Sequence, residues 1–295
     1  MKNWALFIVI LTGCNQIHKE HEPIDIQGHR GARGLAPENS IPAFLLATKL
    51  GVNTLELDVV VSKDRKIIVS HEPYISPDFC FDVNGDTISS DSIINIYRLN
   101  YDEVKKFDCG SSGNVKYPEQ KKVAVYKPLL SDVIDTVESY IQSNQLKRVN
   151  YNIELKSKRS TEEEFHPSPP SFSDLVYQLL KAKGLLEQTT IQSFDFRILQ
   201  FFHQKYPEVK LVLLIENELN WKVNIDSLGF IPEVYSPYYP LLSRAEVHEI
   251  HDGGMKVIPW TVNEPAIMEQ LIVWGVDGII TDYPDRALRI TENDE

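Results

Sequence analysis

The sequence is poor in cysteine, in positive charge and in long apolar runs, and each shortage excludes a class of protein. It has three cysteines in 295 residues and no Cys/His cluster that suggests a zinc site. Lys and Arg number 30 against 42 Asp and Glu, and the formal net charge of −12 argues against a nucleic-acid partner. The apolar run from Trp4 to Leu11 is too short for a membrane-spanning helix, which needs about 20 residues. What remains is an acidic globular protein.

The N-terminus has the pattern of an export signal. Lys2 precedes the apolar run, and Thr12 and Gly13 lead to Cys14. This ending resembles a bacterial lipoprotein signal, in which the cysteine becomes the lipidated first residue. We expect residues 1–14 to be the signal peptide, residues 15–23 a tether, and Cys14 a lipid anchor that holds the protein to a membrane of the cell envelope, facing the periplasm or the cell surface. An ordinary signal peptide or a hydrophobic tail is the alternative.

The other two cysteines lie in one irregular segment. An extracytoplasmic location permits a disulfide between Cys80 and Cys109. Two free, buried thiols are the alternative, and the sequence leaves the choice open.

Apolar, β-rich segments alternate with helical patterns along the rest of the chain. The predicted strands are Ile24–Gln27, Thr54–Val61, Ile67–Ser70, Val149–Leu155, Thr189–Gln192, Val209–Ile215, Val234–Ser236, Val257–Thr261 and Gly278–Thr281. Helices are expected at 39–51, 129–141, 172–186, 197–206, 244–251 and 266–274. Such alternation favours an all-parallel sheet covered by helices.

The length favours one TIM (β/α)8 barrel over residues 24–290, since such barrels take about 250 residues. Nine predicted strands are one more than the barrel needs, and the shortest, Val234–Ser236, is the one we expect to be irregular. Residues 73–127 are rich in Pro, Asp, Gly and Ser and form a predicted insertion after the third strand. A doubly wound open sheet is the rival, but no Gly-rich dinucleotide-binding motif follows the first strand.

Acidic residues near the ends of two predicted strands suggest a metal site. Glu56 and Asp58 are two residues apart in one strand and therefore point to the same face. Both faces of a parallel strand are normally covered, and two buried carboxylates repel each other unless a positive charge lies between them. Glu154 occupies a similar place in another strand. Three carboxylates suit Ca²⁺ or Mg²⁺, which prefer oxygen ligands.

Two histidines follow predicted strands. His29 follows the first strand and His71 the third, where the active sites of such barrels lie. Imidazoles carry protons near neutral pH, and cleavage of a phosphodiester needs one group to activate the nucleophile and another to protonate the leaving group. Either histidine alone is as well explained by a hydrogen bond to a loop backbone. The pair, together with the three acids, favours a catalytic role.

The charge balance of these residues fits an anionic substrate. Three carboxylates and one divalent cation sum to −1, which would repel a phosphodiester. Arg30 and Lys156 bring the sum to +1, and a guanidinium can hold a phosphate through two parallel hydrogen bonds.

In this combination and order, the motifs resemble the glycerophosphodiester phosphodiesterase family over about residues 26–284. The motifs are His29-Arg30-Gly31, Pro37-Glu38-Asn39-Ser40, Glu56-Leu57-Asp58, Ser70-His71, Glu154-Leu155-Lys156, Gln192-Ser193-Phe194-Asp195, Pro259-Trp260-Thr261-Val262-Asn263 and Gly278-Ile279-Ile280-Thr281-Asp282-Tyr283-Pro284.

The resemblance implies metal-dependent hydrolysis of glycerophosphodiesters to an alcohol and glycerol 3-phosphate. It implies that Glu56, Asp58 and Glu154 bind Ca²⁺ or Mg²⁺, that His29 and His71 are the general acid and base in an open order, and that Arg30 and Lys156 bind phosphate. It further implies that Phe194 and Trp260 flank the glycerol and that Glu38 orders the site. A phospholipase-type phosphodiesterase acting on intact lipid, or a non-catalytic glycerophosphodiester-binding module, is the alternative. The sequence does not indicate an oligomeric state.

Overall fold

The computed structural model describes residues 23–292. The predicted signal peptide, Cys14 and residues 15–22 of the predicted tether lie outside the described residues. Among the helices of residues 23–292, none is long and apolar enough to cross a membrane.

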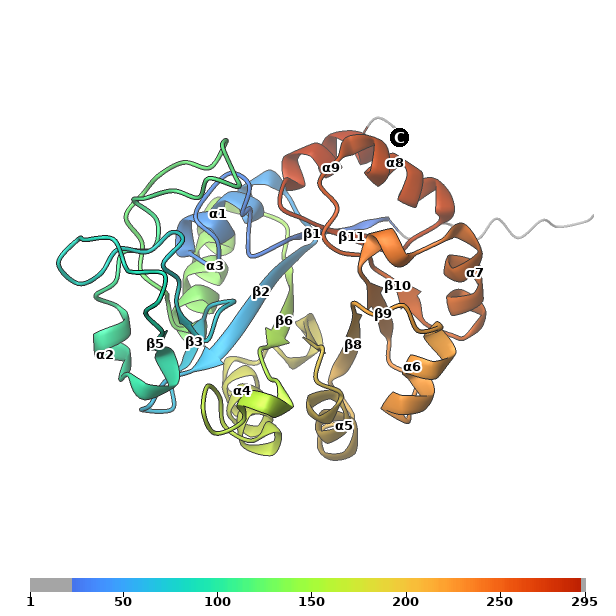
Figure 1. Ribbon diagram of the computed structural model, residues 1–295. Coiled ribbons are helices and arrows are strands. Elements are labelled where there is room, and N and C mark those ends of the chain that lie inside the picture. Colours follow the sequence, from blue (N-terminus) through green and yellow to red (C-terminus); the bar gives the residue numbers. More distant parts are fainter. Residues whose placement is uncertain (1–22, 293–295) are drawn as a thin grey trace, which may run out of the picture.

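Eight parallel strands form the predicted barrel (Figure 1). They are β1 (Asp25–Gly28), β2 (Thr54–Val61), β6 (Asn150–Leu155), β7 (Thr189–Ser193), β8 (Lys210–Ile215), β9 (Val234–Pro237), β10 (Lys256–Val257) and β11 (Gly278–Thr281). Their order is β10-β9-β8-β7-β6-β2-β1-β11. Backbone hydrogen bonds close the ring between β11 and the chain after β10, from Val262 N to Ile280 O at 2.9 Å and from Ile280 N to Pro259 O at 3.1 Å.

The third predicted strand is not a barrel strand. β3 (Ile67–Val69) pairs antiparallel with the end of β2, with Val59 opposite Val69. Residues 62–66 allow only a hairpin, because a parallel crossover needs a dozen residues or more. The expected irregular segment, Val234–Ser236, is instead the barrel strand β9, so the prediction of which strand is surplus was wrong.

Helices surround the strands as an outer ring (Figure 1). They are α1 (Ile41–Leu50), α3 (Leu130–Asn144), α4 (Pro169–Lys183), α5 (Phe196–Lys205), α6 (Trp221–Leu228), α7 (Arg244–Asp252), α8 (Pro265–Trp274) and α9 (Pro284–Glu292). Short 3₁₀ turns are η1 (Ile96–Arg98), η2 (Arg159–Thr161), η3 (Leu186–Gln188) and η4 (Tyr239–Leu241). α1 begins as predicted, with Ser40 accepting a hydrogen bond from Ala43 N, and ends at Gly51, whose φ is 96°. α6 and α9 were not predicted.

The segment between β3 and α3 forms the insertion, on the α1–α3 side of the ring (Figure 1). It contains β4 (Tyr74–Ile75), β5 (Ile94–Asn95) and the single-turn helix α2 (Tyr101–Val104). Its apolar side chains form a small core with Val60 and Ile68 of the hairpin. A disulfide joins Cys80 to Cys109 within this core, which decides between the two alternatives that the sequence left open.

The barrel interior has a polar half and an apolar half. Buried polar side chains line the inner faces of β1, β2, β6 and β7, whereas Val212, Val234, Ile258 and Ile280 pack together on the other side. The main core lies outside the barrel, between strands and helices, and includes Leu55, Leu57 and Val59. The outward face of β2 is therefore held by the core, and its inward face is left for acidic residues.

Candidate active site

The three predicted metal ligands lie together at the mouth of the barrel. Glu56 and Asp58 point inward from β2, and Asp58 is directly opposite Glu154 in the register of β2 with β6. One oxygen from each carboxylate lies within 4.8 Å of the others, and all three residues are buried. The alternation of β2 thus places two acids on one face, as predicted, and the neighbouring strand supplies the third.

Burial and neighbouring charges shift the pKa values of the three carboxylates in this cluster. Burial, reinforced by repulsion from Asp58, raises the pKa of Glu56 well above its ordinary value. Burial also raises the pKa of Glu154, with Asp58 adding to the shift. In contrast, His71, Arg30 and Lys156 outweigh burial and lower the pKa of Asp58. Buried carboxylates whose protonation is favoured by mutual repulsion, with oxygen as the donor atom, fit a divalent cation.

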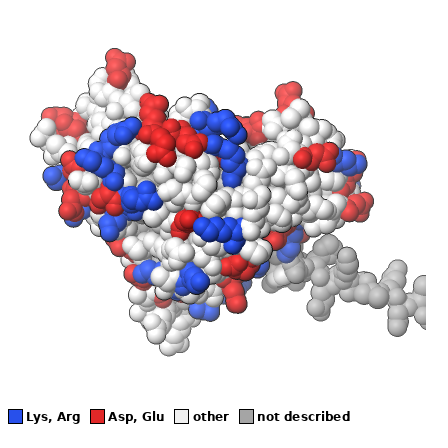
Figure 2. Space-filling view, turned by 90° about the horizontal axis from the view of Figure 1, so that it is seen from below, with Lys and Arg blue, Asp and Glu red and all other residues white. Residues whose placement is uncertain are grey.

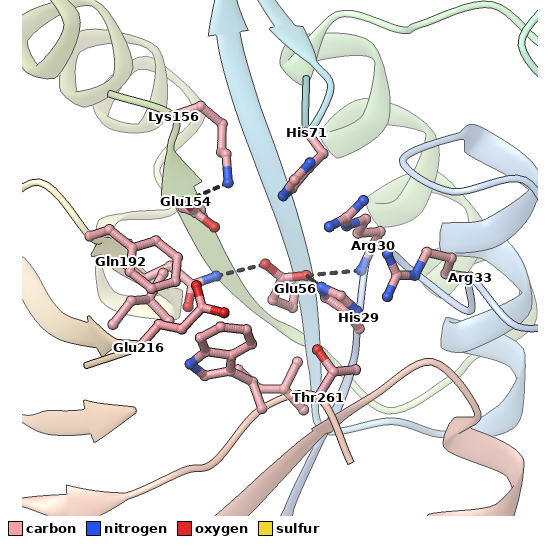
Figure 3. Close-up of a pocket in the computed structure, with 14 residues that line it drawn as sticks. His29, Arg30, Arg33, Glu56, His71, Glu154, Lys156, Gln192, Glu216 and Thr261 are labelled. Carbon is pink, nitrogen blue, oxygen red and sulfur yellow. Dashed lines mark hydrogen bonds and ion pairs between the residues drawn. The ribbon is translucent and has the colours of Figure 1, made fainter. Parts of the chain in front are cut away.

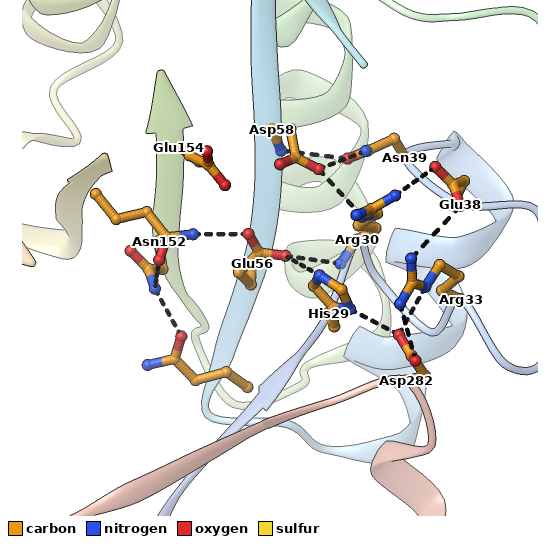
Figure 4. A network of polar contacts seen from close by, with 12 residues as sticks. His29, Arg30, Arg33, Glu38, Asn39, Glu56, Asp58, Asn152, Glu154 and Asp282 are labelled. Carbon is orange, nitrogen blue, oxygen red and sulfur yellow. Dashed lines mark hydrogen bonds and ion pairs between the residues drawn. The ribbon is translucent and has the colours of Figure 1, made fainter. Parts of the chain in front are cut away.

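His29 lies at the end of β1, beside Glu56. Its Nδ1 is 2.7 Å from Asp282 Oδ1 and its Nε2 is 3.9 Å from Glu56 Oε2 (Figure 4). Because a carboxylate only accepts hydrogen bonds, Nδ1 carries the proton and Nε2 carries the lone pair. Burial, followed by the charge of Arg33, lowers the pKa of His29 to about 4, so the imidazole is neutral at pH 7.

His71 reaches the cavity by a different route from the one predicted. It follows the antiparallel strand β3 and so does not lie at the C-terminal end of a barrel strand. The hairpin turns the chain back along β2, where Ser70 N donates to Asp58 O at 2.9 Å. His71 Nδ1 contacts Glu72 Oε1 at 2.8 Å, and the ring is more exposed than that of His29.

Arg30 is held by carboxylates on several sides. Its Nη1 donates to Glu38 Oε1 at 2.8 Å, its Nε is 3.3 Å from Asp58 Oδ2, and its backbone N–H donates to Glu56 Oε2 at 2.9 Å (Figure 4). Lys156 Nζ is 2.7 Å from Glu154 Oε1 and 3.7 Å from Asp58 Oδ1. The two predicted phosphate-binding cations therefore flank the acid cluster from opposite sides.

These groups open into one cavity of about 320 Å³ (Figure 3). Its lining residues are His29, Arg30, Arg33, Glu56, His71, Glu154, Lys156, Gln192, Phe194, Leu214, Glu216, Trp260, Thr261 and Ile280. Asp58 and Glu38 do not line the cavity, and both contact the side chain of Arg30. Phe194 and Trp260 meet edge to face, with ring centres 5.4 Å apart, and form its apolar wall together with Leu214 and Ile280.

Sequence reasoning missed several groups at this site. Asp282 and Gln192 lie within motifs that we quoted, but no role was given to them. Asn39, also in a motif, donates to Asp58 Oδ2 at 2.8 Å. Arg33 and Glu216 carry no sequence signal, because only the fold brings them to the cavity.

The charges on the face shown in Figure 2 are mixed, with acidic and basic side chains interspersed.

A model of the glycerophosphoryl diester phosphodiesterase family matches residues 29–286. The chain belongs to this family. A glycerophosphodiester phosphodiesterase of Bacillus subtilis (strain 168) is 32% identical over 87% of this chain and 83% of its own length. A solved structure from Silicibacter pomeroyi DSS-3 is 26% identical with a TM-score of 0.82, covering 92% of this chain and 94% of that chain.

A second solved structure agrees in fold. A phosphodiesterase of Oleispira antarctica, solved in complex with sn-glycerol-3-phosphate, has a TM-score of 0.72 at 22% identity, over 92% of this chain and 97% of that one. As a member of the glycerophosphoryl diester phosphodiesterase family, this protein is a metal-dependent hydrolase of glycerophosphodiesters, and its acid cluster is suited to the metal.

Proposed function

We propose that this phosphodiesterase releases glycerol 3-phosphate and an alcohol at the cavity described above, with His29 and His71 as its two proton carriers. One observation carries the proposal: a single cavity is lined by both imidazoles, by carboxylates of the acid cluster and by Arg30 and Lys156. The Oleispira antarctica phosphodiesterase, whose fold this chain shares, binds sn-glycerol-3-phosphate as a product, which supports the product expected here.

We assign Ca²⁺ or Mg²⁺ to Glu56, Asp58 and Glu154. When bound, such an ion supplies Lewis-acid neutralisation of the phosphoryl oxygens. The chain's own contribution is a set of three carboxylates already held within 4.8 Å of one another. Lys156 and Arg30 add positive charge on either side of the acid cluster, where they would hold phosphate oxygens.

His29 is placed to act as the general base. Asp282 keeps the proton on Nδ1, so the free lone pair on Nε2 faces the cavity and accepts a proton from the attacking hydroxyl or water. Arg33 and Arg30 lie nearby, and their charges disfavour an imidazolium in the resting enzyme.

His71 is placed to act as the general acid. Its Nδ1 is 2.8 Å from Glu72 Oε1, and this contact orients the ring so that it can pass a proton to a leaving alkoxide. We propose that Phe194 and Trp260 pack against the carbon atoms of the glycerol, and that Glu38 positions Arg30 through their 2.8 Å hydrogen bond. The insertion and His71 follow the same hairpin, so the leaving group is expected on that side.

The leaving group separates the two roles. We expect His71→Ala to lose about 10²–10⁴-fold in kcat on glycerophosphoethanolamine, because an alkoxide needs a proton, and to lose far less on bis(p-nitrophenyl) phosphate, whose phenolate leaves unprotonated. His29→Ala should lose activity on both substrates alike. Equal losses for His71→Ala on both substrates would remove its role as acid. Turnover of intact phosphatidylethanolamine above that of glycerophosphoethanolamine would favour a phospholipase, and binding without turnover would favour a binding module.

We also propose a lipid anchor at Cys14 and a location at the cell envelope, held to the membrane and facing the periplasm or the cell surface. The support is the sequence pattern of residues 1–14 alone. Mass spectrometry of the mature N-terminus should find diacylglycerol on Cys14, and Cys14→Ala should shift the protein from the membrane fraction to the soluble fraction. An unmodified Cys14 in a membrane-free mature protein would reject this assignment.

A further inference from the structure

A row of amide side chains crosses the interior of the barrel and ends on Glu56. Gln192 Nε2 donates to Glu56 Oε1 at 2.6 Å (Figure 3), and Gln192 Oε1 accepts from Asn152 Nδ2 at 3.1 Å. Asn152 Nδ2 also donates to Gln27 Oε1 at 2.9 Å, and Gln27 Nε2 donates to Asp25 Oδ2 at 2.8 Å. The row therefore runs from a carboxylate near the N-terminal end of the barrel to a carboxylate of the metal site.

When the carboxylates at its two ends are ionised, the direction of every hydrogen bond in this row is fixed. Asp25 and Glu56 only accept when ionised, so each neighbouring glutamine turns its NH₂ group outward and its carbonyl inward. The two inward carbonyls need two donors, and the NH₂ group of Asn152 has one hydrogen for each. Thr190 Oγ1 completes the set by donating to Asn152 Oδ1 at 3.0 Å.

Glu56 differs from the other two acids of the cluster in the groups that hold its carboxylate. Lys156 contacts Glu154, and Arg30 contacts Asp58, so each has a cation as its partner. Glu56 is held instead by neutral N–H groups, from Gln192 on Oε1 and from the backbone of Arg30 on Oε2. These bonds fix the carboxylate without cancelling its charge, and each oxygen keeps a lone pair for a cation.

We infer that the amide row positions Glu56 as a metal ligand, with Asn152 as the positioning residue at its centre. This inference rests on the metal site of the proposed function. Gln27, Asn152 and Gln192 are each buried, at 3%, 1% and 1% exposed, so the loss of one amide leaves its neighbours without their protein partner. Removal of the central NH₂ leaves both glutamine carbonyls unpaired and frees the Gln192 amide to turn away from Glu56.

Cation binding by the chelator-treated protein tests this inference without reference to turnover. Asn152→Leu keeps the branching of the side chain but removes both donors, and Gln192→Met removes the donor to Glu56. Titration calorimetry with Ca²⁺ and with Mg²⁺ should show affinities weaker by about 10–100-fold for both variants, the usual effect of losing a partner of a metal ligand. Asn150→Leu is the matched control, because Asn150 precedes Asn152 by two residues on β6, is exposed and takes no part in the row.

Excess metal adds a second readout. Because the proton carriers are untouched, saturating Ca²⁺ or Mg²⁺ should restore most of kcat in Asn152→Leu and Gln192→Met, whereas a general packing defect would not respond to metal. If wild type binds cation and the folded variants bind it equally well, the amide row has no such role. Should Asn152→Leu fail to fold, Gln192→Met alone decides. A wild-type protein that binds neither ion would overturn the metal site and this inference together.

Discussion

Replacement of Asp282 by asparagine tests how the proton of His29 is placed. Asp282 Oδ1 accepts from His29 Nδ1 and from Arg33 Nε, each at 2.7 Å, and Oδ2 accepts from Arg33 Nη2 at 3.0 Å and Asn263 Nδ2 at 2.8 Å. An asparagine has one oxygen and one NH₂ group in place of the two carboxylate oxygens Oδ1 and Oδ2. Its NH₂ group must therefore face groups that also donate.

The NH₂ group should turn toward His29, since the imidazole alone can change its tautomer. Asn263 cannot turn without losing the bond from the backbone N–H of Asp282 to its Oδ1, which is 3.0 Å long. With the amide facing His29, Nδ1 becomes the acceptor and the proton moves to Nε2, the atom we assign as base. The loss should then approach that of the missing base, about 10²–10⁴-fold in kcat. This corresponds to about 3–5 kcal/mol of transition-state free energy.

The assay is kcat with glycerophosphoethanolamine and with bis(p-nitrophenyl) phosphate, combined with nitrogen NMR of His29 to identify its tautomer. Asp285→Asn is the matched control, because Asp285 is paired with Arg289 at 2.8 Å and does not line the cavity. A folded Asp282→Asn variant that keeps wild-type kcat, or one in which Nδ1 still carries the proton, would refute the reasoning.

Four further predictions concern the metal and the stability of the fold. Chelation should abolish turnover and Glu56→Gln should weaken cation binding in calorimetry; full activity after thorough chelation would contradict both. Changing both Cys80 and Cys109 to serine should lower the free energy of unfolding by about 3–4 kcal/mol. The reason is that the disulfide closes a loop between residues 29 apart in sequence and so reduces the entropy of the unfolded chain. An unchanged urea midpoint would argue against this. Phe172→Ala, at a fully buried position of α4, should cost about 3–5 kcal/mol in the same assay, and a loss below one kcal/mol would mean that the site collapses around the deletion.

The parts of the fold that sequence predicts are those with a strong local period. The β-branched content of Thr54–Val61 indicated the strand, and the alternation of strand side chains placed its two acids on one face. Ser40 and Gly51 marked the ends of α1. The hairpin was missed because Ile67–Val69 is as β-rich as a barrel strand. Its distinguishing signal was the short connection at residues 62–66, which is too short for a parallel crossover.

Two helices and part of the site were missed for a different reason. In α6 the inward stripe includes Asn224, a polar residue whose amide donates to Tyr235 Oη at 3.1 Å, so its apolar pattern is interrupted. In α9 only Pro284 and Ala287 are buried, which is too narrow a stripe to recognise. Asp282 and Arg33 could not be paired from sequence, because their contact depends on the closure of β1 against β11.

Because of the β2–β3 hairpin, the two proposed proton carriers come from different parts of the chain. The barrel itself carries His29, the acids and the cations, whereas His71 is delivered by a loop whose far side continues directly into the disulfide-linked insertion. We expect changes to that insertion to affect which alcohols are released more than they affect the metal centre. The proposed base and metal ligands thus depend on the barrel strands, whereas the proposed acid depends on the hairpin.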